Sequence, residues 1–170
     1  VYSDAAIVNK ASVQKFNGSS WEYVGNQAFT LGEATYTSIK FDNNDIPFIL
    51  YRDGATSGKA TVQKFISNSW SVLGNTGFTS ANALDLSFTF DSNNIPFVLY
   101  KTDNGFKYVS VYSFNNSNWS NVGTQYVSER QGDFSSISID NNNNLFVAYK
   151  DVENGNVGVV KKLISNSWTN

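Results

Sequence analysis

The chain has 170 residues, of which 12 are basic and 14 acidic, so its formal net charge at neutral pH is −2. Neither sign of charge runs in blocks, which excludes the electrostatic footprint of a nucleic-acid-binding protein. Cysteine, histidine and methionine are absent, which removes disulfides, thiol chemistry and the commonest transition-metal ligands. We therefore expect no metal and no cofactor. The absence of any run of about 18 apolar residues predicts no membrane insertion.

The dominant feature of the sequence is a repeat of 49 residues that aligns without insertions. Each copy contains one tryptophan, and a shift of one repeat superposes these tryptophans on one another. The superposed segments are VQKFNGSSWEYVG (13–25, with Trp21), VQKFISNSWSVLG (62–74, with Trp70), VYSFNNSNWSNVG (111–123, with Trp119) and VKKLISNSWTN (160–170, with Trp168). Periods of about 40–50 residues are typical of propellers and solenoids.

Each repeat is predicted to contain four short strands, named A to D in chain order. In the second unit, period-2 alternation and turn residues place them at 36–42, 47–53, 59–65 and 69–73. Strand B reads FILY and is apolar on both faces, so both faces must be covered. A four-stranded antiparallel sheet covered by copies of itself is a propeller blade. We predict an all-β fold, a β-propeller of four-stranded antiparallel blades with about 3.5 repeats in this chain, rather than a linear β-solenoid.

The phase of the repeat divides the chain into four units within one propeller segment, 1–170. They are 1–25 (partial, strands B to D), 26–74, 75–123 and 124–170 (last strand incomplete). One strand A is missing from this count, and strand A is expected to line the central channel. We expect further repeats or another chain to complete the propeller. The start at Val1, without an initiator methionine, favours a mature exported product, although an arbitrary boundary explains it equally well.

These motifs resemble the propeller repeats of secreted bacterial surface and adhesin-like proteins, whose units read W-x-x-V-G, then S-I-x-x-D, then P-x-V-x-Y-x-D. The matching residues of one unit are Trp21, Val24, Gly25, Ser38, Asp42, Pro47, Tyr51 and Asp53. The resemblance covers the whole chain. It implies a secreted or cell-surface protein that binds a glycan or protein ligand, a lectin-like role in adhesion.

Binding residues are expected in the loops that differ most between the units. These are the D–A loops 26–35, 75–84 and 124–133 and the B–C loops 54–58, 103–106 and 152–156. Strand polarity puts both sets on one face, and loops held by a rigid scaffold commonly carry binding residues. The candidates are Gln27, Glu33, Asn82, Arg130 and Gln131, with Phe29, Phe78 and Tyr126 as aromatic neighbours. The alternative is that the two equivalent phenylalanines anchor their loops and that the polar side chains are merely solvated.

Two repeated residue types have an architectural and a functional interpretation. The tryptophans could stack on sugars, but a residue placed identically in every unit is expected first to pack blades together. Asp42, Asp91 and Asp140 lie in Asn-rich turns between strands A and B, where oxygen ligands suit Ca²⁺. Because these turns carry at most two carboxylates each, we favour a turn-stabilising role for the three aspartates.

We predict that the chain is not an enzyme. A Ser-His-Asp hydrolase is excluded without histidine, and Asp4, Asp53 and Asp151 recur in the repeat whereas catalysis needs one asymmetric site. A glycosidase or lyase would require non-repeated acids to converge near the channel. Those acids are Glu22, Glu33, Asp45, Asp85, Asp103, Glu129, Asp133 and Glu153. The leading hypothesis is a non-catalytic recognition module, and the alternative is a structural scaffold or spacer.

Overall fold

The computed structural model describes residues 1–170 and is built almost entirely of antiparallel strands. Three four-stranded sheets follow an N-terminal region of two separate two-stranded sheets, β1-β2 and β3-β4, and within each sheet consecutive strands pair in chain order. The first sheet region holds β1 (Tyr2–Asp4), β2 (Lys10–Ser12), β3 (Gln14–Phe16) and β4 (Trp21–Tyr23). The complete sheets are β5 (Ala34–Phe41), β6 (Pro47–Asp53), β7 (Lys59–Ile66) and β8 (Ser69–Val72); β9 (Ala83–Phe90), β10 (Pro96–Thr102), β11 (Val109–Asn115) and β12 (Asn118–Asn121); and β13 (Gly132–Ile139), β14 (Leu145–Asp151), β15 (Val157–Ile164) and β16 (Ser167–Thr169).

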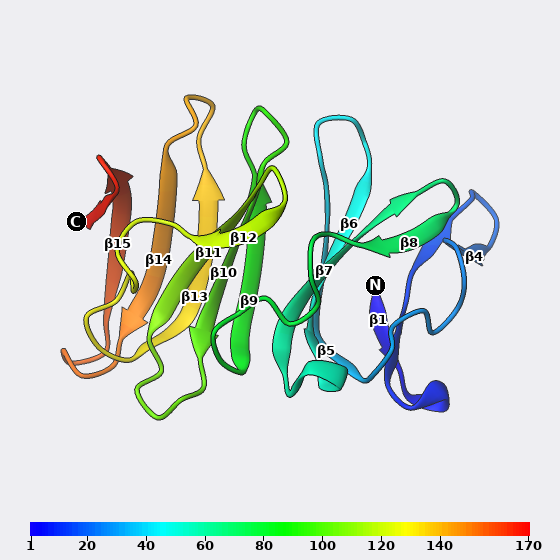
Figure 1. The fold of residues 1–170 in the computed structure, drawn as a ribbon, viewed down its shortest axis with the longest axis horizontal. Helices are drawn as coiled ribbons and strands as arrows, with labels where there is room; N and C mark the ends of the chain where they lie inside the picture. Colours follow the sequence, from blue (N-terminus) through cyan, green and yellow to red (C-terminus); the bar gives the residue numbers. More distant parts are fainter.

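The sheets stand side by side as propeller blades, which confirms the predicted fold class (Figure 1). The first strands of the complete blades, β5, β9 and β13, lie next to one another and form an inner edge. The first and last blades occupy opposite ends of the row in Figure 1. Two 3-10 helices, η1 (Ala5–Ile7) and η2 (Gly54–Thr56), are the helical segments. Neither is long and apolar enough to cross a membrane.

The hydrophobic core lies between the blades rather than within any one of them. Leu50 and Val62 of the second blade join Val98 and Tyr100 of the third in one buried cluster, and each is at most 1% exposed. The second strands of the two middle blades, β6 and β10, are therefore covered on both faces, as their two-sided apolar sequences predict. Burial at about 25 cal/mol per Å² of apolar surface makes these junctions the main source of stability.

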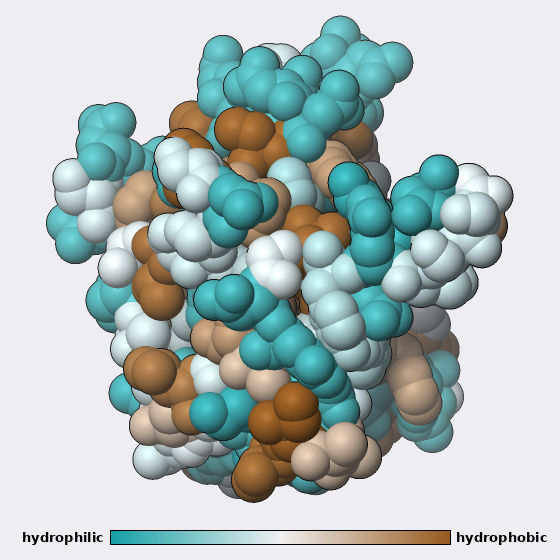
Figure 2. All heavy atoms as spheres, turned by 90° about the vertical axis from the view of Figure 1, so that its right-hand side faces the viewer, coloured by the Kyte–Doolittle hydropathy of each residue, from teal (hydrophilic) through white to brown (hydrophobic).

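The repeated tryptophans connect neighbouring blades. Trp70, Trp119 and Trp168 each donate a hydrogen bond from Nε1 to a backbone carbonyl 46 residues earlier, in the preceding blade, at 2.8, 2.9 and 3.2 Å respectively. Trp21 has no such acceptor, and 65% of its surface is exposed. The first blade faces the viewer in Figure 2, where apolar groups are scattered among hydrophilic ones. The architectural interpretation of the tryptophans is confirmed at the three junctions present.

The aspartates of the A–B turns organise those turns. Asp91 Oδ1 accepts hydrogen bonds from the backbone N–H groups of Asn93 and Ile95, at 2.9 and 2.8 Å. Asp42 and Asp140 make the same pair of bonds in their own turns. These bonds show that the three aspartates stabilise their turns.

One detail of the first strand departs from the sequence-based prediction. In the second blade it begins at Ala34, two residues before the predicted start, because Ala34 pairs with Asp53 beyond a bulge. The bulge residue Tyr36 has φ 50°, which breaks the period-2 alternation from which the strand was predicted. Asp85 and Phe134 hold the equivalent positions, with φ 48° and 52°.

Candidate functional site

The D–A and B–C loops lie at the same end of the blades, as strand polarity predicts. Backbone hydrogen bonds join the two loop sets directly. Gly54 N–H donates to Glu33 O at 2.8 Å, and Asp103 N–H donates to Asn82 O at 2.9 Å. These bonds give the loop face a fixed backbone framework.

Three of the predicted polar residues form side-chain hydrogen bonds near blade boundaries. Asn82 accepts from Arg52 Nε at 2.7 Å and donates to Asp103 at 2.9 Å. Gln27 and Glu33 lie in the loop that precedes β5 and contact residues of the first blade. Gln27 donates to Asp4 at 2.7 Å, and Glu33 accepts from Asn9 at 3.2 Å.

The remaining two predicted polar residues lie in the loop before β13. Arg130 is exposed and forms an ion pair with Glu153 at 3.7 Å. Gln131 donates to both carboxylate oxygens of Asp133, at 3.3 and 3.4 Å. The five predicted polar residues thus share one face but are distributed along it, and each is bonded to its own neighbours.

The three predicted aromatic residues separate into two kinds. Phe29 stacks on Trp70 and Phe78 stacks on Trp119, with ring centroids 4.9 and 4.1 Å apart. Both phenylalanines therefore anchor their loops to a blade junction. Tyr126 instead borders a hollow of the third blade, which makes it the predicted residue that leads to a pocket.

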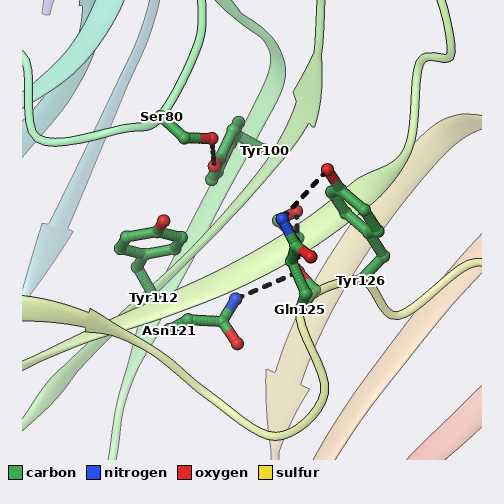
Figure 3. A pocket seen from close by; sticks show the side chains of 7 residues that line it. Ser80, Tyr100, Tyr112, Asn121, Gln125 and Tyr126 are labelled. Carbon is green, nitrogen blue, oxygen red and sulfur yellow. Dashed lines mark hydrogen bonds between the residues drawn. The ribbon is translucent and has the colours of Figure 1, made fainter.

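This hollow, hereafter the tyrosine pocket, has a volume of about 190 Å³ and lies on the blade β9–β12 (Figure 3). Strands β10, β11 and β12 form its floor, and the loops before β9 and after β12 form its sides. Its lining residues are Ser80, Tyr100, Ser110, Tyr112, Asn121, Gln125 and Tyr126. None of them carries a charge at neutral pH.

Two of the tyrosines form an aromatic corner of the tyrosine pocket. The rings of Tyr100 and Tyr112 meet edge-on with centroids 5.6 Å apart, and the hydroxyls of Ser80 and Tyr100 are hydrogen-bonded at 3.1 Å. Burial raises the pKa of Tyr100 to about 12. Its phenol therefore stays protonated at physiological pH and keeps its capacity to donate.

Amide groups occupy the other side of the tyrosine pocket. Asn121 Nδ2 donates to the Gln125 carbonyl at 3.1 Å, and Gln125 Nε2 donates to the Tyr126 hydroxyl at 3.2 Å. These bonds orient both amides and leave their side-chain oxygens, Oδ1 and Oε1, as acceptors without a protein partner. The pocket thus combines aromatic walls with hydroxyl and amide groups of fixed direction.

Sequence reasoning missed Tyr112 because it focused on the loops. This residue lies in the third strand of its blade, and the equivalent residues of the other units are Gln14, Gln63 and Lys161. The available signal was a position that is glutamine in the first two units but changes to tyrosine and then to lysine in the last two. In the second blade, Gln63 bonds to the Tyr51 hydroxyl at 2.9 Å and is only 5% exposed.

A second group of functional interest lies at the inner edge, where two of the non-repeated acids converge. Lys101 Nζ lies 2.9 Å from carboxylate oxygens of both Asp85 on β9 and Asp133 on β13. Burial alone would raise the pKa of Asp133, but hydrogen bonds from Lys101 and Gln131 bring the pKa below its ordinary value. A general acid requires a raised pKa, so the lowered pKa of Asp133 does not suit that role. The ion pairs of Lys101 with Asp85 and Asp133 instead join two blades electrostatically.

Comparisons with known proteins identify the architecture. No family model matches the sequence, and no curated protein matches it. Among solved structures, a triple mutant of AofleA from Arthrobotrys oligospora is similar, with a TM-score of 0.59, 11% identity and coverage of 95% of this chain and 48% of that chain. This chain therefore spans about half of that protein. The likeness supports the all-β propeller-type fold.

Two further matches are more distant. A fucose lectin from Kordia zhangzhouensis has a TM-score of 0.49 and 14% identity, over 78% of this chain and 95% of that chain. An exo-1,5-alpha-L-arabinanase from a bovine ruminal metagenomic library has a TM-score of 0.47 and 11% identity, over 92% of this chain and 66% of that chain.

These matches correct the prediction that the chain is not an enzyme. The structural neighbours include the arabinanase, and also an intramolecular trans-sialidase from Ruminococcus gnavus, beside the lectin. Enzymes and binding proteins share this kind of fold because function depends on individual sites. We expected an enzyme to require non-repeated acids that converge, and two of these acids, Asp85 and Asp133, do converge on Lys101. Enzyme status is thus unresolved by the fold.

Proposed function

We propose that this chain is a carbohydrate-binding β-propeller segment and that the tyrosine pocket holds a sugar ring. The observation that carries the proposal is an uncharged pocket with three tyrosines, two amides and two serine hydroxyls. Ligand sites are typically concave and lined by aromatic groups, with a few polar groups that fix orientation. Sugar rings present C–H groups to an aromatic face and hydroxyls to amides, which matches this lining.

The size and rigidity of the tyrosine pocket support a small ligand. At about 190 Å³ it lies below the roughly 300–1,000 Å³ of sites for drug-sized molecules, which favours a single sugar ring. The amides are already oriented by the hydrogen bonds of Asn121 and Gln125, so binding does not have to order them. Preorganisation of this kind lowers the entropic cost of association.

The wider role that we propose is glycan recognition by a secreted or cell-surface protein. The lectin among the structural neighbours and the uncharged chemistry of the pocket are compatible with that role. The alternative is a scaffold role, favoured by the recurrence of one tryptophan-mediated junction along the row. A protein with a purely structural role would bind no sugar at the tyrosine pocket.

Glycan-array screening followed by isothermal titration calorimetry tests the proposal. Tyr112→Ala is expected to weaken binding of the selected glycan about tenfold or more, which corresponds to about 1.4 kcal/mol. Tyr112→Phe should retain most of the affinity if stacking dominates. Trp21→Ala removes an exposed aromatic residue far from the pocket and serves as the matched control. Affinity that survives Tyr112→Ala, or is lost in Trp21→Ala, would contradict the assignment of this pocket.

A further inference from the structure

The last blade carries a second hollow at the place equivalent to the tyrosine pocket. Five lining positions correspond through the 49-residue repeat. They pair as Ser80 with Glu129, Tyr100 with Tyr149, Ser110 with Val159, Tyr112 with Lys161 and Asn121 with Asn170. The second hollow, hereafter the lysine pocket, has a volume of about 160 Å³ and is also bordered by Asp151 and Asn154. The fold thus places hollows at equivalent positions in adjacent blades and lines them with different chemistry.

The distinctive residue of the lysine pocket is Lys161. Its side chain is only 9% exposed, and its ammonium lies 3.6 Å from a carboxylate oxygen of Glu129, which itself is 88% exposed. This separation is longer than a hydrogen bond, and the Lys161 ammonium donates no hydrogen bond to any protein group. An ammonium carries three donors, and Lys161 Nζ is not among the fully buried atoms that lack a hydrogen-bond partner, so its donors remain accessible from the hollow. The pocket therefore presents unused donors to whatever enters it.

Carboxylates face the same hollow. Asp151 keeps one oxygen bonded to the Asn154 N–H at 3.2 Å, and Glu129 lies opposite Lys161. Burial, followed by the charges of Asp151 and Glu129, raises the pKa of Tyr149 to about 12. Two carboxylates and one ammonium give the lining a net charge of −1. An anionic ligand would be repelled by this balance.

We infer that the lysine pocket is a second sugar site, which recognises adjacent hydroxyls of an uncharged sugar through charge-assisted hydrogen bonds. A hydroxyl both accepts and donates, whereas an ammonium only donates and a carboxylate only accepts. Two neighbouring hydroxyls can accept from Lys161 and donate to Asp151 or Glu129. Hydrogen bonds to charged groups are roughly twice as strong as neutral ones, so a diol satisfies the unused donors.

This inference rests on the proposed function and extends it from one site to two sites of different chemistry. The second blade has no hollow at the equivalent place, and there Gln63 bonds to Tyr51 and is almost fully buried. Two sites in neighbouring blades would allow a branched or repeated glycan to bind both at once. Such a glycan gains avidity through effective concentration.

Calorimetry with methyl glycosides of mannose, galactose, fucose and glucuronic acid tests the two sites separately. Wild-type protein is expected to bind two equivalents of an uncharged glycoside. Lys161→Met should lose one of them, Tyr112→Ala the other, and the double variant both. Lys162→Met is the matched control, because adjacent residues of a strand face opposite sides of the sheet. Thermal unfolding of each variant establishes that it is folded, and Lys161→Gln provides a second variant if Lys161→Met is not.

The outcomes distinguish the two proposals. Unchanged stoichiometry in Lys161→Met, with loss of binding in Tyr112→Ala, overturns the lysine pocket and leaves the proposed function standing. The reverse result overturns the tyrosine pocket. Loss of the Lys161-dependent equivalent on O-methylation of adjacent hydroxyls supports diol recognition. Preference of that site for the glucuronoside, or absence of any binding by wild-type protein, would overturn the inference.

Discussion

The indole of Trp119 donates a hydrogen bond at 2.9 Å to the carbonyl of Leu73, across the junction between the second and third blades. The same ring stacks on Phe78 at a centroid distance of 4.1 Å. One side chain therefore provides both a polar and an aromatic link between blades. Trp70 and Trp168 form the equivalent hydrogen bonds at the neighbouring junctions.

Replacement of Trp119 by alanine is expected to destabilise the protein by about 3–5 kcal/mol, the usual cost of removing a large packed aromatic side chain. Trp119→Phe should cost less, because it keeps a ring but leaves the Leu73 carbonyl without its donor. Chemical denaturation measures both changes. Trp21→Ala is the control and should change stability by about 0.5 kcal/mol or less, since that ring is mostly exposed. Equal effects at both tryptophans would contradict the junction role.

The Lys101 group predicts a defined dependence of stability on pH. The pKa of Asp133 is lowered in the folded state, so its stabilising contribution is complete above the unfolded pKa of about 3.9. This contribution is lost as the pH falls through the lower folded pKa. Asp133→Asn should therefore be less stable than wild type at pH 7, and the difference should shrink at pH values below about 4.

Thermal melting between pH 2 and pH 7 measures this effect. Glu153→Gln removes the exposed partner of Arg130 and serves as the control, with no expected change in the pH profile, because exposed ion pairs contribute little. A difference between Asp133→Asn and wild type that stays constant across this range would rule out an electrostatic origin.

The A–B turns are expected to depend on their aspartates. Asp91→Ala removes the acceptor of two backbone N–H groups and should cost about 1–3 kcal/mol. Asp91→Asn retains an amide oxygen at that place and should cost less. Asn141→Ala, at an exposed turn position, provides the control in the same denaturation experiment. If Asp91→Ala changes stability no more than Asn141→Ala, the turn-stabilising interpretation fails.

The bulge of the first strand predicts a stabilising substitution. Tyr36 is half exposed with φ 50°, a backbone region that bulky residues seldom adopt and that asparagine tolerates. Tyr36→Asn is therefore expected to raise the free energy of unfolding by about 0.5–1 kcal/mol, whereas Tyr36→Val should lower it. A loss of stability in Tyr36→Asn would show that the tyrosine ring has a role that its exposure does not reveal.

The sequence by itself determined the blade. The 49-residue spacing, the Asn-rich turns and the two-sided apolar strand at 47–53 each follow from local rules, because turn chemistry and residue alternation are fixed by neighbours in the chain. Strand bounds agreed within two residues where no bulge intervened, as at Pro47–Asp53. The role of the tryptophans also followed, since a residue required at every junction must recur with the repeat.

The tertiary structure alone decided where side chains from different segments meet. The loop face was predicted, but of the eight candidate residues only Tyr126 reached the tyrosine pocket. The strand residue Tyr112 was overlooked because an aromatic residue in a strand is expected to belong to the core unless the residues that surround it in space are known. The convergence of Asp85 and Asp133 on Lys101 could not be predicted from the sequence either, because these residues come from two blades and the two aspartates lie at bulges of their strands. Contacts between repeats depend on three-dimensional packing, which a one-dimensional spacing does not specify.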